Sequence, residues 1–291
     1  MKQSIRSLAA RKSAKKPITW LTCYDYSMAH ALNSSELDMI LVGDSGGMTV
    51  LGYSDTVPVT MDEMIMLCKS VRRGAPDKFI VGDMPKGSYE VSSDEAVKNA
   101  MRFVKESGCD AVKLEGAGIM INRIGAITSA GIPVVGHLGL TPQTSAQFGG
   151  YRVVGRSTSE AQQLRDDALS VQNAGAFALL LEATPPDLGG LISTSLDILC
   201  LGIGAGKNVD GQLLILHDLL GLYPNFRPKF AKCYVPYILE TFSETLRGES
   251  NYAKFGRDTR MDGFYALTLL SVRQFIREVE ENIFPGESFS Y

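Results

Sequence analysis

The sequence predicts an α/β fold, a (β/α)8 TIM barrel with an N-terminal helix and a C-terminal helical extension. Short apolar runs recur along the chain and end abruptly in an acid, as in 38–45 and 78–83. Such runs are typical of strands that are buried on both faces in a parallel sheet. Segments with helix-capping signals separate them, so that strand and helix are expected to alternate eight times. The 291 residues suit one barrel domain over 1–291, with 219–291 as a helical C-terminal addition.

The expected elements follow in order from these patterns. Strands are predicted at 18–24, 38–45, 78–83, 111–115, 133–137, 177–182, 197–203 and 213–217. Helices are predicted at 27–35, 60–74, 92–108, 117–130, 157–175, 235–248 and 262–282. The runs 60–63 and 92–95 match a capping box, which marks a helix start.

The first 24 residues carry six Lys and Arg and no acid. This composition weakly resembles an organelle transit peptide. A basic helix that covers the bottom of the barrel is the favoured alternative, because the first strand already begins near residue 18.

Composition favours a small-molecule partner in the cytoplasm. A net charge of −3 and a pI near 5.7 provide no field that would gather nucleic acid or an anionic membrane. The five cysteines are widely spaced, without a C-x-x-C pair, and are expected to be reduced and mostly buried. No run reaches the roughly 18 apolar residues that a membrane span needs.

Three acids close consecutive predicted strands: Asp44, Asp83 and Glu115. Because the carboxyl ends of parallel strands meet at one end of a barrel, these side chains are expected to lie together. Carboxylate oxygens suit Mg²⁺, which keeps water ligands that a substrate displaces. The structural alternative for each acid is a helix cap or a pair with Lys113, but three in succession favour a metal site.

Lys113 and Glu115 lie two residues apart on one strand and therefore share a face. A charged pair that faced the helices would be buried without water, so the lumen is favoured. Lys113 can there place a cation beside an anionic substrate or form a structural ion pair with Glu115, and the two roles can coexist.

Glu182 ends the sixth predicted strand, opposite the second in a ring of eight. A carboxylate across the lumen from a metal can act as a general base if apolar neighbours raise its pKa. The structural alternative is a helix cap before Pro185 and Pro186.

Histidines and glycines give weaker signals. His137 and His217 are expected to close strands as packed, hydrogen-bonded side chains, since the acids suit Mg²⁺ better than a histidine set suits Zn²⁺. The glycine run 202–206 follows the seventh strand, where barrels often bind phosphate, but a tight turn explains it equally well.

Several long motifs resemble the ketopantoate hydroxymethyltransferase family, in order along the chain. They span 22–27, 41–50, 71–76, 112–116, 136–143, 148–151 and 203–206. Motifs of this length in the same order are highly specific. The segment 285–287 also resembles the tail of that family.

The resemblance implies a Mg²⁺-dependent barrel enzyme of pantothenate biosynthesis. Its reaction would transfer a one-carbon unit from 5,10-methylenetetrahydrofolate to 3-methyl-2-oxobutanoate. By the matching motifs, Asp44 and Asp83 would bind Mg²⁺, with Glu115 as the third acid, directly or through water. Asp44, Ser45, Asp83 and Lys113 would contact the keto acid, and Glu182 would remove its C3 proton. The family also implies a homodecamer or another homo-oligomer.

Two departures from the family pattern bear on function. Lys86 and Gly87 replace a bulky pair in the loop after the third strand, so a different or more polar keto acid is possible if that loop touches the substrate. A run within 235–265 exceeds the shorter family tail and carries Arg247, Lys254, Arg257 and Arg260. It could shape the folate entrance, form a subunit contact or be a solvated helix pair.

Two competing interpretations remain. A Mg²⁺-dependent C–C lyase or mutase of the phosphoenolpyruvate-binding barrel type would also use an enolate, but such enzymes carry a mobile cysteine loop that is not found here after strand four, and they give Glu182 no role. A barrel retained for binding alone would be marked by a broken acid set, whereas Asp44, Asp83, Glu115 and Glu182 are all present.

Overall fold

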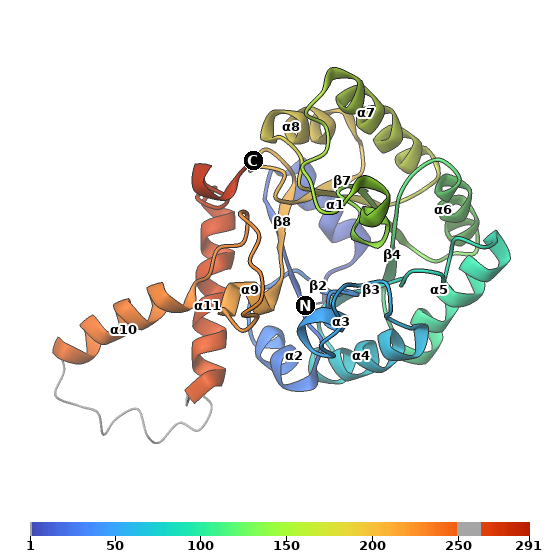
Figure 1. The fold of residues 1–291 in the computed structure, drawn as a ribbon. Coiled ribbons are helices and arrows are strands. Elements are labelled where there is room, and N and C mark those ends of the chain that lie inside the picture. The colour runs from blue at the N-terminus through green and yellow to red at the C-terminus, as the bar shows by residue number, and fades with distance from the viewer. Residues whose placement is uncertain (1, 249–262) are drawn as a thin grey trace.

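The computed structural model describes residues 2–248 and 263–291 and forms a closed barrel of eight parallel strands, surrounded by helices (Figure 1). Each strand pairs with the next one along the chain, and β8 closes the ring on β1 through the pairs Ile18–Gly211 and Leu21–Leu214. The predicted (β/α)8 fold is therefore confirmed.

The strands are short and almost wholly buried, because helices cover their outer face and side chains fill the lumen. They are β1 Ile18–Thr22, β2 Met39–Val42, β3 Phe79–Asp83, β4 Ala111–Glu115, β5 Val134–Gly139, β6 Ala178–Glu182, β7 Leu199–Ile203 and β8 Gly211–Leu214.

The α-helices are α1 Ile5–Ser13, α2 Tyr26–Asn33, α3 Gly46–Thr49, α4 Met61–Gly74, α5 Ser93–Ser107, α6 Met120–Ser129, α7 Thr158–Asn173, α8 Pro186–Ser195, α9 Leu216–Leu220, α10 Val235–Gly248 and α11 Gly263–Glu280. Two 3-10 helices, η1 Pro142–Phe148 and η3 Glu287–Phe289, complete the elements discussed here.

The eighth strand differs from the prediction of 213–217. β8 runs from Gly211 to Leu214, and His217 lies in α9 rather than at a strand end. The chain leaves the sheet because the Leu216 N–H donates to Thr22 Oγ1, and the Leu219 N–H then donates to the Ile215 carbonyl as a helix begins. A run of leucines suits a helix as well as a strand, so the apolar pattern alone could not place this boundary.

The expected eightfold alternation of strand and helix is also incomplete. No helix lies between β7 and β8, where a short loop leads directly into Gly211. The chain instead supplies α11, which packs against β1 and α2 after the long excursion through α10 (Figure 1). The basic residues predicted at 254, 257 and 260 lie outside the described residues.

Helix starts follow the predicted capping signals, with one exception. Thr60 and Glu63 form the full capping box of α4. Ser92 caps α5 by accepting from the Glu95 N–H, but no return bond from Glu95 is found in the described part of the chain, so the second predicted box is only half formed.

The described cysteines and helices agree with the expectation of reduced, mostly buried thiols and of no membrane span. All five cysteines are free thiols, and four of them are buried. Within residues 2–248 and 263–291, every helix is too short or too polar to cross a membrane.

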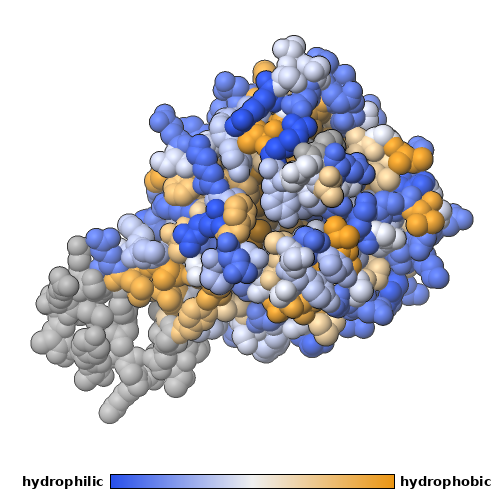
Figure 2. All heavy atoms as spheres, in the orientation of Figure 1, coloured by the Kyte–Doolittle hydropathy of each residue, from blue (hydrophilic) through white to orange (hydrophobic). Residues whose placement is uncertain are grey.

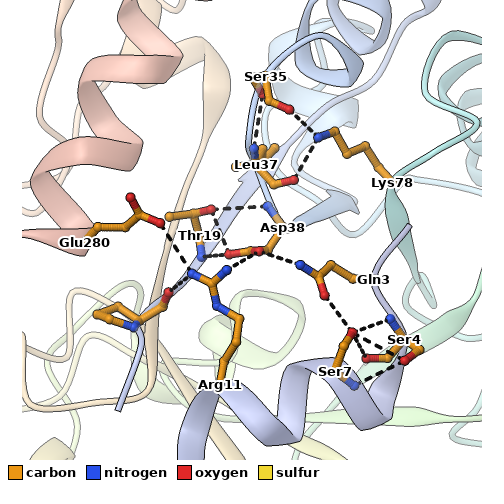
Figure 3. Close-up of polar contacts among 11 residues, drawn as sticks. Gln3, Ser4, Ser7, Arg11, Thr19, Ser35, Leu37, Asp38, Lys78 and Glu280 are labelled. Atoms are coloured by element: carbon orange, nitrogen blue, oxygen red, sulfur yellow. Dashed lines mark hydrogen bonds and ion pairs between the residues drawn. The ribbon is translucent and has the colours of Figure 1, made fainter. Parts of the chain in front are cut away.

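The basic helix α1 covers the bottom of the barrel, as the favoured alternative predicts. Figure 3 shows Arg11 reaching Asp38, the residue before β2, with 2.9 Å between Nη1 and Oδ1. Asp38 is 2% exposed and also accepts from Gln3 and from the Thr19 N–H and hydroxyl. Arg11 lies 3.5 Å from Glu280 of α11 as well, so one guanidinium joins the start of the chain to its last long helix.

Arg11→Met is expected to lower the free energy of unfolding by about 2 kcal/mol, because it leaves the buried Asp38 carboxylate without its cation. Urea unfolding followed by circular dichroism measures the change. Arg6→Met is the matched control, since Arg6 is exposed on the same helix. Equal stability of the two variants would show that the Arg11–Asp38 pair contributes little.

Candidate active site

The residues predicted for the site lie together in one pocket at the carboxyl ends of the strands. Its lining includes all six of them: Asp44, Ser45, Asp83, Lys113, Glu115 and Glu182. His137 lines the same pocket. The strands therefore bring together residues that are up to 138 positions apart, from Asp44 to Glu182 (182 − 44).

Asp44 and Asp83 are neighbours on adjacent strands. Asp83 is the last residue of β3, and Asp44 follows β2 after Gly43. The Asp44 N–H donates to Asp83 Oδ2 at 3.1 Å, which fixes the second carboxylate against the backbone of the first. Both side chains are almost completely buried. This is the pair of acids that the sequence placed at consecutive strand ends.

Lys113 lies between two of the acids. Its Nζ atom is 2.5 Å from Asp83 Oδ1 and 3.6 Å from Glu115 Oε1, and its side chain is 3% exposed. The register of β3 and β4 sets this contact, because Asp83 and Lys113 are directly paired. The structural ion pair is present, and since Lys113 also lines the pocket, its two predicted roles are compatible.

The buried charges shift one another's protonation. Burial, and then the charge of Asp83, raises the pKa of the Asp44 carboxyl well above its usual range. Burial also opposes ionisation of Glu115, but Lys113 and His137 outweigh it and lower the pKa of Glu115. Burial disfavours the charged form of Lys113, yet Asp83, Glu115 and Asp44 together raise its pKa. The surroundings therefore oppose ionisation of Asp44 and favour the charged forms of Glu115 and Lys113.

His137 bridges two carboxylates, a role that the sequence analysis did not assign. Its Nδ1 atom lies 3.2 Å from Glu115 Oε1, and its Nε2 atom lies 3.2 Å from Glu182 Oε2. Neither ring nitrogen has a hydrogen-bond partner among the described residues, so the two contacts are chiefly electrostatic. Burial and Lys113 oppose the imidazolium, but the two glutamates raise the pKa of His137 to about 9.

Glu182 is the most accessible acid of the group, with a side chain that is 15% exposed. It ends β6, which stands opposite β2 in the closed order of strands. No hydrogen bond from Glu182 to a helix N-terminus is found in the described residues. The capping alternative therefore has no support, and Glu182 lines the same pocket as Asp44.

Ser45 and Tyr24 form a hydroxyl pair beside the acids, with 2.8 Å between Ser45 Oγ and the Tyr24 hydroxyl. The Tyr24 ring contacts His217, with 5.2 Å between the ring centroids. His217 thus belongs to a packed aromatic contact in α9, although not at the strand end where it was predicted.

Gln143 is the second residue that sequence reasoning missed. It lies in η1, directly after β5, and is 3% exposed. It contacts both Asp44 and Glu115 through hydrogen bonds. The sequence did contain one feature that could have identified Gln143. It closes the motif 136–143, a few positions after the end of a predicted strand.

The outer half of the pocket is apolar and aromatic. Its aromatic lining comes from segments outside the strands: Tyr151, Tyr223, Phe226, Phe230 and Tyr291. The glycine run 202–206 forms a tight turn against this aromatic lining, which was the structural alternative to a phosphate site. Gly204 has a φ of +68°, and a Cβ there would lie 2.5 Å from the Phe230 ring.

The loop with Lys86 and Gly87 does not reach the pocket. Neither residue lines it, and Lys86 pairs with Glu90 at 3.1 Å.

A divalent cation was tested against the donors that are present. Across residues 2–248 and 263–291, no three His, Cys, Asp or Glu side chains converge on a ready-made metal centre. Mg²⁺ does not need such a centre, since it keeps several waters and binds through one or two carboxylates. Asp44 and Asp83 are such a pair, since they adjoin each other and both line the pocket. The donors therefore fit Mg²⁺.

Solved structures share the fold at low identity. A 2,3-dimethylmalate lyase of the PEP mutase/isocitrate lyase superfamily aligns with a TM-score of 0.57 and 15% identity, covering 97% of this chain and 98% of that one. An oxaloacetate acetylhydrolase aligns with a TM-score of 0.59 and 13% identity, over 96% and 98% of the two chains. These similarities show the barrel architecture alone.

Curated relatives are far more similar in sequence. The "3-methyl-2-oxobutanoate hydroxymethyltransferase" of Heliobacterium modesticaldum is 45% identical over 280 residues, which cover 96% of this chain and 92% of the relative. The protein of the same name from Moorella thermoacetica is 49% identical over 254 residues, covering 87% and 94%. The family model described as ketopantoate hydroxymethyltransferase matches residues 2–255. The chain belongs to the ketopantoate hydroxymethyltransferase family.

Proposed function

We propose that this protein transfers a hydroxymethyl group from 5,10-methylenetetrahydrofolate to the enolate of 3-methyl-2-oxobutanoate. The product is 2-dehydropantoate, an intermediate of pantothenate biosynthesis. The names of the relatives support the reaction and the keto acid. The observation that carries the proposal is the position of Glu182, which lines one pocket with Asp44, Asp83 and Lys113.

Asp44 and Asp83 would hold Mg²⁺, with Glu115 acting through water because Gln143, His137 and Lys113 surround its oxygens. A bound Mg²⁺ supplies Lewis acidity, which polarises the carbonyl of a keto acid and makes the proton on the neighbouring carbon easier to remove.

Ser45 and Lys113 orient the keto acid, since a hydroxyl and an ammonium suit its carboxylate and the negative charge that develops on its oxygen. Glu182 takes the C3 proton from the opposite side. His137 holds the Glu182 carboxylate from below and faces Glu115 with its other nitrogen, which keeps Glu182 pointed into the pocket.

Water adds to the methylene carbon of the donor, both of its C–N bonds break as the two nitrogens take up the protons, and tetrahydrofolate leaves with the carbon at the aldehyde level. The enolate carbon then bonds to this carbon, whose oxygen takes a proton to become the hydroxyl group. Because the donor methylene carries no oxygen, water thus supplies the hydroxyl oxygen of the product. The aromatic wall formed by Tyr151, Phe226 and Phe230 suits the flat ring system of a folate.

Two alternatives to this reaction remain. One is transfer of the hydroxymethyl group to a different keto acid, and the other is a lyase or mutase reaction. The lyases and mutases share only the fold with this chain, at 15% identity or less for the two described above. A panel of 2-keto acids incubated with Mg²⁺ in D₂O, with C3 exchange followed by NMR, distinguishes the candidate substrates. We also propose a cytoplasmic location, which suits the five free thiols.

Asp44→Asn and Asp83→Asn are each expected to abolish Mg²⁺ binding in calorimetry and metal-dependent turnover, because each removes one of two charged ligands. Circular dichroism should report an unchanged fold. Asp187→Asn is the control, since Asp187 is exposed at the start of α8. Mg²⁺ binding and turnover at the wild-type level in both site variants would place the cation elsewhere.

Glu182→Gln is expected to slow C3 deuterium exchange by about 10²–10⁴-fold, because a positioned base contributes that much to the rate. Affinity for the keto acid should change little, since Ser45, Lys113 and Mg²⁺ make those contacts. Glu36→Gln is the control, as Glu36 is largely exposed.

The result is read from the exchange rate and the affinity together. Loss of affinity with exchange retained would make Glu182 a binding residue. Wild-type values of both would transfer the role of base to another group of the pocket.

We further propose that the chain forms a homo-oligomer, up to the decamer that the family resemblance implies, with a contact near α10. Figure 2 shows apolar surface over this region, where Tyr237 and Leu239 are 46% and 54% exposed. Exposed apolar residues gathered on one helix support a contact at this place.

Sedimentation equilibrium is expected to give a mass several times the 31.6 kDa of the chain. Leu239→Lys should lower that mass, because it places a charge on the apolar face. Leu191→Lys is the control, since Leu191 is 58% exposed on α8. A stable monomer of the unmodified chain would remove the proposal.

A further inference from the structure

Gln143 lies beside two acids of the pocket, outside the pocket lining, because of how the chain turns after β5. Gly139 has a φ of +89°, and a Cβ there would lie 2.2 Å from the Glu182 carbonyl. Only glycine can therefore turn at this point, and the turn sends η1 across the ends of the strands. The Leu140 N–H donates to the Glu182 carbonyl and fixes the start of this crossing.

Gln143 then contacts two acids from different strands. Its Nε2 atom donates to Asp44 Oδ2 at 2.8 Å, and its backbone N–H donates to Glu115 Oε2 at 3.1 Å. Nε2 also donates to the Met84 carbonyl at 3.0 Å. Gln143 thus connects three neighbouring strand ends. It contacts Asp44 after β2, Met84 after β3 and Glu115 at the end of β4.

The orientation of the amide is determined by its surroundings. The Tyr89 hydroxyl accepts from the Glu115 N–H and donates to Gln143 Oε1, which lies 2.6 Å away. The other end of the amide faces two acceptors and must be the NH₂ group. Tyr89 is 2% exposed and does not line the pocket, so its hydroxyl bears on the acids through these two contacts.

The amide leaves one Asp44 oxygen available. Gln143 occupies Oδ2, and no hydrogen bond to Oδ1 is found among the described residues, although Asp44 lines the pocket. Donors held in this way orient metal-binding carboxylates in many proteins, and their loss weakens metal affinity by about 10–100-fold.

We infer that Gln143 is a positioning residue that holds Asp44 and Glu115 in the orientation required by the cation site, and that Tyr89 fixes its amide. This inference rests on the proposed function, because it assumes that the acids bind Mg²⁺. It goes beyond that proposal in naming the two residues that prepare the acids for the cation.

The test is calorimetric titration of the whole protein with MgCl₂ alone, without keto acid or folate. Gln143→Met fills similar space without a hydrogen-bonding group and is expected to raise the Kd for Mg²⁺ by about tenfold or more. Tyr89→Phe removes only the hydroxyl and should raise the Kd by about two- to tenfold, the worth of one hydrogen bond.

Gln212→Met is the matched control. Gln212 is a glutamine of β8 that is equally 3% exposed, and its Nε2 atom donates to the Gly206 carbonyl away from the acids. Thermal unfolding of each variant without Mg²⁺ measures the purely structural cost of each substitution.

Each outcome decides between the proposals. If the unmodified protein does not bind Mg²⁺, the proposed cation site fails, and the role of Gln143 fails with it. If the unmodified protein binds but Gln143→Met keeps its Kd, or Gln212→Met loses as much affinity, only the assignment of Gln143 is overturned. If Gln143→Met does not fold, Tyr89→Phe decides, and an unchanged Kd in that variant overturns the inference.

Discussion

The site depends on the burial of three carboxylates around a single ammonium. Lys113 pairs with Asp83 and Glu115, Asp44 adjoins Asp83, and all four side chains are almost completely buried. Burying a charge costs several kcal/mol unless it is paired and hydrogen-bonded, so every other feature of the pocket floor serves to offset that cost. Backbone N–H groups and His137 supply part of this compensation. The excess of negative charge that remains is what makes the pocket a fitting place for a divalent cation.

Acidic residues are paired with cations at one end of the barrel and exceed the cations at the other end. At the bottom, Asp38 and Asp210 precede β2 and β8, and α1 pairs them with Arg11 and Lys12. Those acids have a cation built into the fold and contribute to stability. At the top, the acids outnumber the cations that the chain supplies. Parallel strands allow this division because all eight begin at one end and finish at the other.

Local sequence was enough to predict the acids but not the residues that arrange them. Asp44, Asp83 and Glu182 each follow an apolar run, so strand pattern and strand order placed them correctly in one pocket. Gln143 could not be placed in the same way, because its position depends on a backbone turn at Gly139 and on a tyrosine 54 residues earlier. His217 was misplaced because leucine-rich segments fit a strand and a helix equally well.

The pocket combines parts with different origins in the chain. Its charged floor comes from the strand ends, where register sets atomic positions within the rigid sheet. Its aromatic wall comes from the connections and from the C-terminal segment, which returns so that Tyr291 packs against Phe230 with 6.1 Å between ring centroids. Chemistry that needs fixed charges is thereby placed on the rigid element, while recognition of a larger apolar partner is placed on segments that can vary without disturbing the barrel. A change in the C-terminal segment is therefore expected to alter binding of the donor before it alters removal of the proton.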